Sequence, residues 1–284
     1  MHEYEQAEAK RQERIDEGRG TGTGADYISW IAFRDFRSKG DESRKSEGRH
    51  GREILTLSTV EARTFFMLDV NPDVIEIYDQ YPLDREETRS IARDLGIEHP
   101  KCPRSGADLD MTSDFLAEVR TDTGIVRLPF QCKSSADLSN FRVAEKMEIE
   151  RRYWHAHGKK LRVATESPAC IPDAFFKNAR RLQQHRFLHK AVVNDVTLPY
   201  EERKALILAA VRAASASETL NELAGRLAQQ TSHSIDQFTQ VISNLVYRGD
   251  LVCNMHAVDL LSQNVLAVSQ ATQARVDRLA RRAA

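Results

Sequence analysis

Four residues in the first half of the chain have the side chains needed to hold a divalent cation against a phosphate. Asp114 and Glu61 offer carboxylates, and Gln131 and Lys133 follow at the end of a predicted strand. Carboxylate and amide oxygens are ligands that Mg²⁺ prefers. A bound cation lowers the pKa of water, and a lysine beside it can face that water. The residue types therefore predict metal-assisted hydrolysis of a phosphodiester.

Two runs of alternating residues would bring three of these side chains together. Residues 111–120 and 125–133 alternate between apolar and polar side chains, and a Thr-Asp-Thr-Gly turn separates them, which predicts a β-hairpin. Because side chains alternate along a strand, Gln131 and Lys133 share one face. Asp114 is predicted to project from that face of the neighbouring strand.

Three of these residues also have ordinary structural interpretations. Asp114 could be a solvent-facing acid on an amphipathic strand, although aspartate is depleted in strands. Lys133 could be an exposed lysine that ends a strand. Ser58 to Glu61 match a capping box, in which the glutamate returns to the cap amide. For Glu61 the cap and the metal ligand are both open interpretations.

The set resembles the pattern of magnesium-dependent PD-(D/E)xK nucleases, with one departure. Gln131 stands where that pattern usually has an acidic residue. Its oxygen can bind Mg²⁺ but adds no negative charge, so we expect weaker metal affinity. The main-chain carbonyl of Cys132 is a further candidate metal ligand.

The composition limits the classes of protein and partner. The chain has 41% hydrophobic residues and a mean hydropathy of −0.51. It has no apolar run near the roughly 20 residues of a membrane helix. The N-terminus is charged, unlike a secretory signal. The four cysteines contain no CxxC pair, which argues against a zinc site or a disulfide framework and favours a protein of the reducing cytosol. The net charge is −1, so nucleic acid would have to meet local basic patches or be delivered by a partner.

The pattern divides the chain into three parts. Residues 1–26 are predicted to form a flexible N-terminal segment whose first part can be a short helix. Residues 27–166 mix helices and strands around the hairpin, which predicts an α/β fold. Residues 167–284 are predicted to be helical and winged-helix-like, with a short strand at Leu251–Cys253. We expect helices over 58–70, 84–95, 140–157, 173–213, 217–230, 232–248 and at the C-terminus, and strands over 74–78 and 161–165.

Two basic segments are candidates for contact with DNA. Residues 27–52 combine aromatic and basic side chains, and both an irregular surface segment and a DNA-contacting one fit that composition. Glu145, Glu148 and Glu150 alternate with basic residues, which predicts an exposed, salt-bridged helix face. The cations selected as candidate backbone contacts are Arg34, Arg37, Lys39, Lys146, Arg151 and Arg152.

Seven short segments occur in an informative order. They are Leu57–Glu61, Asp79–Leu83, Glu87–Ala92, Gly96–Pro100, Met111–Phe115, Gln131–Lys133 and Glu145–Trp154. Taken together they resemble the TnsA endonuclease family, one subunit of heteromeric transposases. The likeness covers about residues 20–166 and continues less distinctly beyond them.

The resemblance implies a restriction-endonuclease-like catalytic domain over residues 27–166 and a winged-helix-like domain over 167–284. It implies catalytic positions at Glu61, Asp114 and Lys133, a glutamine at the position of Gln131, and Mg²⁺ bound as two ions per site, for which Mn²⁺ can substitute. It implies cleavage of the 5′ ends of transposon DNA in the bacterial cytoplasm. The implied partners are an integrase-type subunit and a regulatory ATPase. A stand-alone restriction or repair nuclease, and a non-catalytic winged-helix DNA-binding assembly protein, remain the alternatives.

Overall fold

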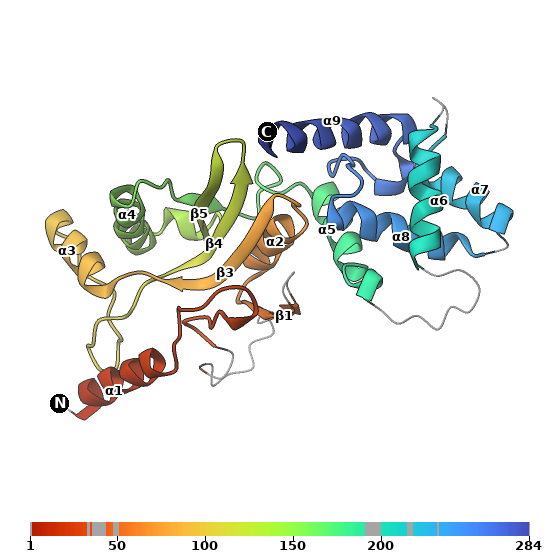
Figure 1. Cartoon of the computed structure of the whole chain (residues 1–284). Helices are drawn as coiled ribbons and strands as arrows, with labels where there is room; N and C mark the ends of the chain where they lie inside the picture. The colour runs from red at the N-terminus through yellow and green to blue at the C-terminus, as the bar shows by residue number, and fades with distance from the viewer. Residues whose placement is uncertain are drawn as a thin grey trace. The chain divides into compact units, whose positions relative to one another are not determined.

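The computed structural model describes residues 2–32, 35, 44–47, 51–190, 200–214, 218–231 and 233–283 (Figure 1). Side chains are not described for 44–47 or beyond residue 279. The chain divides into two compact units. The first comprises residues 1–68 and 73–170, and the second comprises 69–72 and 171–284. Each unit is described by itself below.

A four-stranded mixed sheet forms the centre of the N-terminal unit. Its strands are β3 (Val74–Pro82), β4 (Thr112–Thr121), β5 (Gly124–Cys132) and β6 (Arg162–Ala164), in that spatial order. The pairs β3–β4 and β4–β5 are antiparallel, and β5–β6 is parallel. The predicted hairpin and the α/β class are thus confirmed. The unit also contains α1 (His2–Asp16), β1 (Arg44–Glu47), β2 (Glu53–Thr56), α2 (Thr59–Asp69), α3 (Arg85–Leu95) and α4 (Phe141–Ala156).

Neighbouring residues of β4 enter two different cores because strand side chains alternate between faces. Phe115, which lies opposite Phe130, packs with Phe65 of α2 in one cluster. Leu116 packs with Trp154 of α4 in the other cluster. Helices α2 and α4 therefore cover opposite faces of the sheet, which makes a three-layer arrangement.

Replacing Phe115 by Ala should lower the free energy of unfolding of this unit by about 3–5 kcal/mol, because Phe115 is fully buried in a packed core. Both tryptophans, Trp30 and Trp154, belong to the N-terminal unit. Urea unfolding followed by tryptophan fluorescence therefore measures its stability. Ile125→Ala, at a hairpin position that is 62% exposed, is the control and should change stability by less than about 0.5 kcal/mol. Equal effects of the two substitutions would contradict this packing.

The two helices predicted by their capping residues form as expected. Asp84 caps α3 by accepting a hydrogen bond from the Glu87 amide. Gly96 ends that helix with φ of 66°, a left-handed conformation that glycine adopts without steric cost. Asn140 caps α4 by accepting hydrogen bonds from two backbone amides. These caps fix where each helix starts against the sheet.

The N-terminal segment contains the helix that the sequence predicts for its first part. Residues 2–16 form α1, a helix of 15 residues, and its Arg11 pairs with Asp110 at 2.8 Å. Tyr27 and Trp30 are buried, so both interpretations of residues 27–52, an irregular surface segment and a DNA-contacting one, are wrong at these two positions. Their aromatic rings supply core surface to the N-terminal unit. The candidate DNA contacts Arg34, Arg37 and Lys39 lie outside the described residues.

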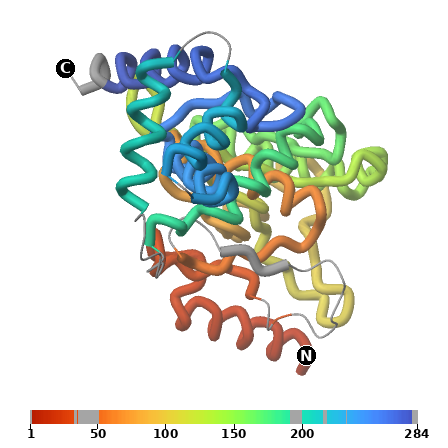
Figure 2. The backbone as a smooth tube through the Cα atoms, turned by 90° about the vertical axis from the view of Figure 1, so that its right-hand side faces the viewer, coloured from red at the N-terminus to blue at the C-terminus, as the bar shows by residue number. Residues whose placement is uncertain are grey.

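The C-terminal unit is helical. Its helices are α5 (Asp173–Gln184), α6 (Tyr200–Arg212), α7 (Leu220–Thr231), α8 (Ile235–Arg248) and α9 (Val265–Ala283). Helix α8 contacts α5, α6 and α7 and lies among them in Figure 2. Its N-terminus carries a complete capping box between Ser234 and Gln237. No helix in the described part of the chain is long and apolar enough to cross a membrane.

Two predictions for the C-terminal unit are wrong. The helical pattern over 173–213 is broken, because α5 ends at Gln184 and His185 is its C-cap. Leu251–Cys253 forms no strand. The Leu251 amide instead donates to the carbonyl of Leu245 at 3.2 Å, and the Val252 amide donates to the Thr272 hydroxyl at 2.9 Å. These bonds use the backbone donors that a strand would have needed.

Candidate active site

The ammonium of Lys133 lies among three oxygens that are predicted from the sequence to be metal ligands. Nζ donates a hydrogen bond to the carbonyl of Cys132 at 3.0 Å and lies 3.9 Å from Oδ2 of Asp114. The Gln131 amide satisfies both of its ends when its oxygen accepts from Lys133 Nζ at 2.8 Å. The Lys133 side chain is 28% exposed, so this cluster is open to solvent on one side.

Asp114 is a buried carboxylate held by partners other than lysine. The hairpin register places it beside the end of β5. There the Cys132 amide donates to Oδ2 at 2.6 Å, and Gln80 Nε2 lies 3.5 Å from Oδ1. Burial raises the pKa of Asp114, while Lys133 and these hydrogen bonds oppose that rise. The backbone of one strand thus fixes the side chain of the other.

Glu61 lies in the first turn of α2, where its carboxylate interacts with Asp114. Its Oε2 accepts from the Leu57 amide at 2.9 Å, and its Oε1 accepts from the Ser58 hydroxyl at 3.0 Å. The Ser58 hydroxyl in turn accepts from the Glu61 amide at 3.1 Å. Burial, and then the charge of Asp114, raises the pKa of Glu61 to about 7. The Ser58 hydroxyl therefore caps α2, while the Glu61 carboxylate accepts from the Leu57 amide instead of the predicted Ser58 amide. The same carboxylate interacts electrostatically with Asp114.

A third buried carboxylate of this site, Glu150 of α4, orients the glutamine. Gln131 Nε2 donates to the two Glu150 oxygens at 3.1 and 3.3 Å when its oxygen faces Lys133. Ser113 donates to Glu150 Oε1 at 2.6 Å, and Trp154 donates to Ser113 at 2.8 Å. Burial raises the pKa of Glu150 to about 8. This network holds the Gln131 oxygen toward the ammonium.

Glu150 does not lie on the exposed, salt-bridged helix face that the sequence predicts for it. Glu148 does lie there, paired with Arg151 and Arg152 at 2.6 and 2.8 Å. Glu150 is instead 2% exposed. The available signal was spacing, because Glu150 lies three and four residues before the buried Tyr153 and Trp154 and shares their helix face.

The raised pKa of Glu150 has a measurable consequence for stability. The folded carboxyl keeps its proton up to a pH of about 8, whereas its ordinary pKa is 4.5. The folded state then binds more protons than the unfolded chain between these values, so the free energy of unfolding falls as pH rises from about 4.5 to about 8. Glu150→Gln cannot ionise and should make this fall shallower.

The measurement is urea unfolding by tryptophan fluorescence across pH 5 to 8, with a chelator present. Glu148→Gln is the matched control, because arginine pairing lowers the Glu148 pKa to about 2. The stabilisation that ionised Glu148 contributes is complete above pH 4.5. Glu148→Gln should therefore leave the change of the free energy of unfolding with pH unaltered between pH 5 and 8. A Glu150→Gln slope equal to that of the unsubstituted protein would show that Glu150 is ionised when folded.

Gln80 has an unusual backbone conformation next to the site. Its φ is 47°, a left-handed region that non-glycine residues enter at a cost. The residue is buried, and its side chain bridges the Thr112 hydroxyl at 3.1 Å and Asp114. The surrounding structure thus holds a strained residue where it orients the Asp114 carboxylate. Sequence pattern gave no signal for this role.

The oxygens present fit a hard divalent cation. Among the described residues there is no group of three or more His, Cys, Asp or Glu side chains placed to bind a metal. The predicted set has only two carboxylates, Glu61 and Asp114. Its other two oxygens come from the Gln131 amide and the Cys132 carbonyl, and Mg²⁺ accepts such ligands. The Cys132 thiol takes no part, because it lies 3.4 Å from Thr64 and burial raises its pKa.

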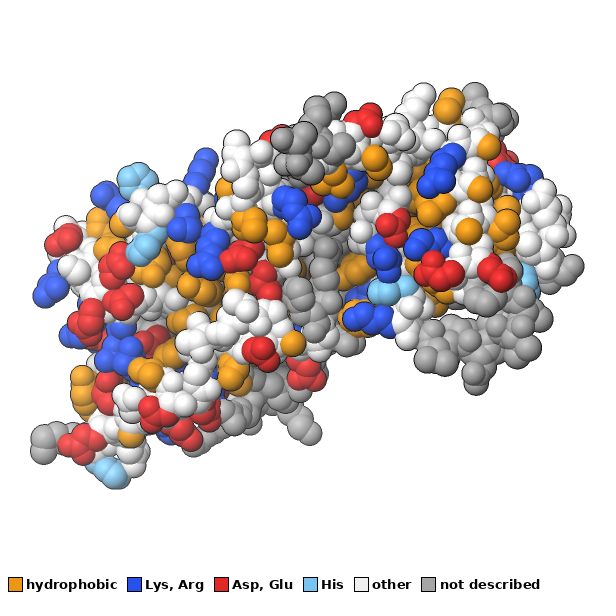
Figure 3. All heavy atoms as spheres, in the orientation of Figure 1, with side chains coloured by type: hydrophobic (Ala, Val, Ile, Leu, Met, Phe, Trp, Pro, Cys, Tyr) orange, Lys and Arg blue, Asp and Glu red, His pale blue; other side chains and the backbone are white. Residues whose placement is uncertain are grey.

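The candidate DNA contacts on α4 form a mixed surface. Lys146 is exposed, and Arg151 and Arg152 are half-exposed, but both arginines pair with Glu148. Figure 3 shows acidic and basic side chains interspersed on the visible face of this unit. Any contact with a phosphate backbone there would have to compete with these ion pairs.

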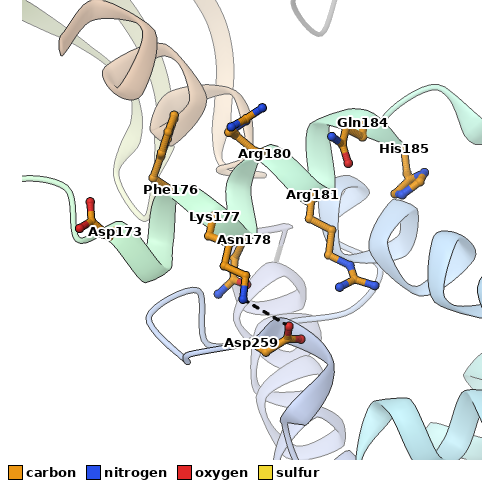
Figure 4. A pocket seen from close by; sticks show the side chains of 9 residues that line it. All are labelled: Asp173, Phe176, Lys177, Asn178, Arg180, Arg181, Gln184, His185 and Asp259. Atoms are coloured by element: carbon orange, nitrogen blue, oxygen red, sulfur yellow. Dashed lines mark ion pairs between the residues drawn. The ribbon is translucent and has the colours of Figure 1, made fainter. Parts of the chain in front are cut away.

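A groove in the C-terminal unit contains none of the predicted site residues. It is a groove of about 570 Å³ along α5. Lys177 points toward Asp259 and pairs with it at 3.7 Å, while Arg180 points away on the other side of the helix (Figure 4). The groove carries charges of both signs, including Asp173. It provides no second cluster of metal-ligand oxygens.

The central segment of the chain is similar to proteins of known class. Residues 71–166 match the family model described as TnsA-like endonuclease N terminal, so this segment is similar to the N-terminal part of TnsA-like endonucleases. It contains Asp114, Gln131, Lys133 and Glu150, whereas Glu61 lies before it. A particular relative is Transposon Tn7 transposition protein TnsA of Escherichia coli, 38% identical over 148 residues. The match covers 52% of this chain and 53% of that protein, so the chain spans about half of its relative's length.

Proposed function

We propose that the protein is a Mg²⁺-dependent DNA endonuclease subunit of a Tn7-type transposase, and that it cleaves the 5′ ends of the transposon. The observation that carries this proposal is the convergence of the Asp114, Gln131 and Cys132 oxygens on one position, within a segment that matches TnsA-like endonucleases. The mixed sheet between α2 and α4 supports a restriction-endonuclease-like fold for residues 27–166.

Each polar group has a proposed role in hydrolysis. Bound Mg²⁺ would polarise the scissile phosphate and lower the pKa of a bound water. Asp114, Gln131 and the Cys132 carbonyl would hold the ion, and Glu61 would complete its ligand shell or a second site. Lys133 would position the attacking water or stabilise the charge that develops on the phosphate. Glu150 and Gln80 would orient the Gln131 and Asp114 side chains.

The C-terminal unit is proposed to contact DNA and partner proteins. Helix α8 begins four residues after α7 ends, and this short spacing supports a helix-turn-helix arrangement of the winged-helix type. The proposed partners are an integrase-type subunit, which would cut and join the 3′ ends, and a regulatory ATPase. The near-neutral charge of the chain fits a subunit that is delivered to DNA by such partners. The exposed cations of α4 are proposed to add backbone contacts.

A strand-resolved excision assay tests this function. DNA carrying transposon ends is incubated with the protein, with and without Mg²⁺ and the proposed partners. We expect cuts at the 5′ ends only when Mg²⁺ and the partners are present, and little cutting by the isolated protein. Efficient cutting by the protein alone at its own sites would favour a stand-alone nuclease. Tight DNA binding with no metal-dependent cutting would favour a non-catalytic assembly protein.

A further inference from the structure

We propose that the ammonium of Lys133 acts as a built-in substitute cation, occupying the position that a divalent metal ion takes when it binds. This inference rests on the proposed function. The ammonium contacts the Cys132 carbonyl at 3.0 Å and the Gln131 oxygen at 2.8 Å, and it lies 3.9 Å from Asp114 Oδ2. These three residues, together with Glu61, are the four predicted to supply oxygen ligands to the metal.

The three oxygens are held in place without the help of Lys133. The Cys132 amide fixes Asp114 Oδ2 at 2.6 Å. The Gln131 amide nitrogen donates to both Glu150 oxygens, which leaves the Gln131 oxygen facing the ammonium. The Cys132 carbonyl belongs to the end of β5, which pairs with β6. Removing the lysine side chain therefore leaves the oxygens converged.

The lysine can leave this position while its backbone stays fixed. The Lys133 amide donates to the Ala164 carbonyl at 3.0 Å, which ties the main chain to the sheet. The side chain is 28% exposed, so a rotation about its flexible stem can carry the ammonium toward solvent or toward a bound phosphate. Metal binding would then move the lysine from a structural position to one beside the substrate.

The consequence is a competition between the ammonium and the metal. A divalent ion that binds these oxygens must displace the Lys133 ammonium, because two positive charges on the same oxygens repel each other. Lys133→Met removes that competitor and keeps a flexible apolar stem. Its dissociation constant for Mn²⁺ should be at least about tenfold lower than that of the unsubstituted protein, with the binding stoichiometry unchanged.

Calorimetric titration of the full chain with Mn²⁺, without DNA, measures this directly. Lys133→Arg retains a cation and should show less than a threefold gain in affinity. Lys160→Met removes an exposed lysine elsewhere in the N-terminal unit and should leave the affinity unchanged. Without metal, Lys133→Met should also unfold at a lower temperature than Lys160→Met, and saturating Mn²⁺ should remove that difference.

Asp114→Asn separates failure of this inference from failure of the proposed function. If Asp114→Asn abolishes Mn²⁺ binding while Lys133→Met weakens it or leaves it unchanged, the metal site stands and the substitute-cation role is wrong. If Asp114→Asn binds Mn²⁺ as well as the unsubstituted protein, the proposed metal site itself is wrong. The inference is supported only when Asp114→Asn loses binding and Lys133→Met gains it.

Discussion

Asp114→Asn is expected to lower strand cleavage at the transposon 5′ ends by at least about a thousandfold. Asp114 supplies a buried carboxylate of the proposed ligand set. Without it, the metal-assisted stabilisation of charge is lost, and the activation barrier should rise by several kcal/mol. The fold should survive, because an asparagine oxygen can still accept the hydrogen bond that Asp114 Oδ2 receives from the Cys132 amide. Loss of activity would therefore report on chemistry rather than on unfolding.

The rate is measured in the complex assembled with the proposed partners, at saturating Mg²⁺ and with strand-specific labels. Asp122→Asn is the matched control, since Asp122 lies at the exposed tip of the same hairpin. Its cleavage rate should stay within about twofold of the unsubstituted protein. Undiminished 5′-end cleavage by Asp114→Asn would remove this carboxylate from the mechanism.

Lys133→Met is expected to lower cleavage by about 10²–10³-fold, the range typical of losing one preorganised charge that stabilises a transition state. The loss should appear in single-turnover rates at saturating metal, where metal affinity no longer limits the reaction. Tighter Mn²⁺ binding together with slower cutting would separate the two roles of this side chain. Lys146→Met, which removes an exposed lysine from α4, is the control.

A Lys133→Met variant that cuts at the normal rate would show that water activation and charge stabilisation come from other groups. In that case the position of the ammonium among the oxygens would be purely structural. A matching loss in Lys146→Met would point instead to a general effect of positive charge on DNA binding.

The hairpin and its partners could be predicted because local rules agreed with the tertiary structure. Alternation over β4 and β5, with a turn between them, was enough to place Asp114 near Lys133, and the structure sets them 3.9 Å apart. Asp84, Gly96 and Asn140 marked helix ends by capping chemistry, which acts within a few residues. Such signals need no knowledge of distant contacts.

Features that depend on distant contacts escaped the sequence analysis. The capping pattern of Glu61 was visible, but its burial near Asp114 depends on how α2 packs against the sheet. Glu150 was assigned to the solvent because the charges around it suggested an exposed face. The strain at Gln80 and the orientation of the Gln131 amide are both set by neighbours far away in the chain.

The C-terminal unit shows a different limit of local pattern. Leu251–Cys253 has strand-like composition, but the Leu251 and Val252 amides donate hydrogen bonds to the Leu245 carbonyl and the Thr272 hydroxyl.

The same limit applies near the N-terminus, where the aromatic residues suggested a surface segment although Tyr27 and Trp30 are core residues. In both places a tertiary contact overrode the local preference.

Anomalous diffraction from crystals soaked in Mn²⁺ tests most directly whether these polar groups form a metal site. A manganese peak should appear within ligand distance of the Asp114 carboxylate and the Cys132 carbonyl, with the Lys133 ammonium displaced from its present contacts. A crystal that takes up Mn²⁺ only elsewhere, and leaves Lys133 where it is, would contradict the account.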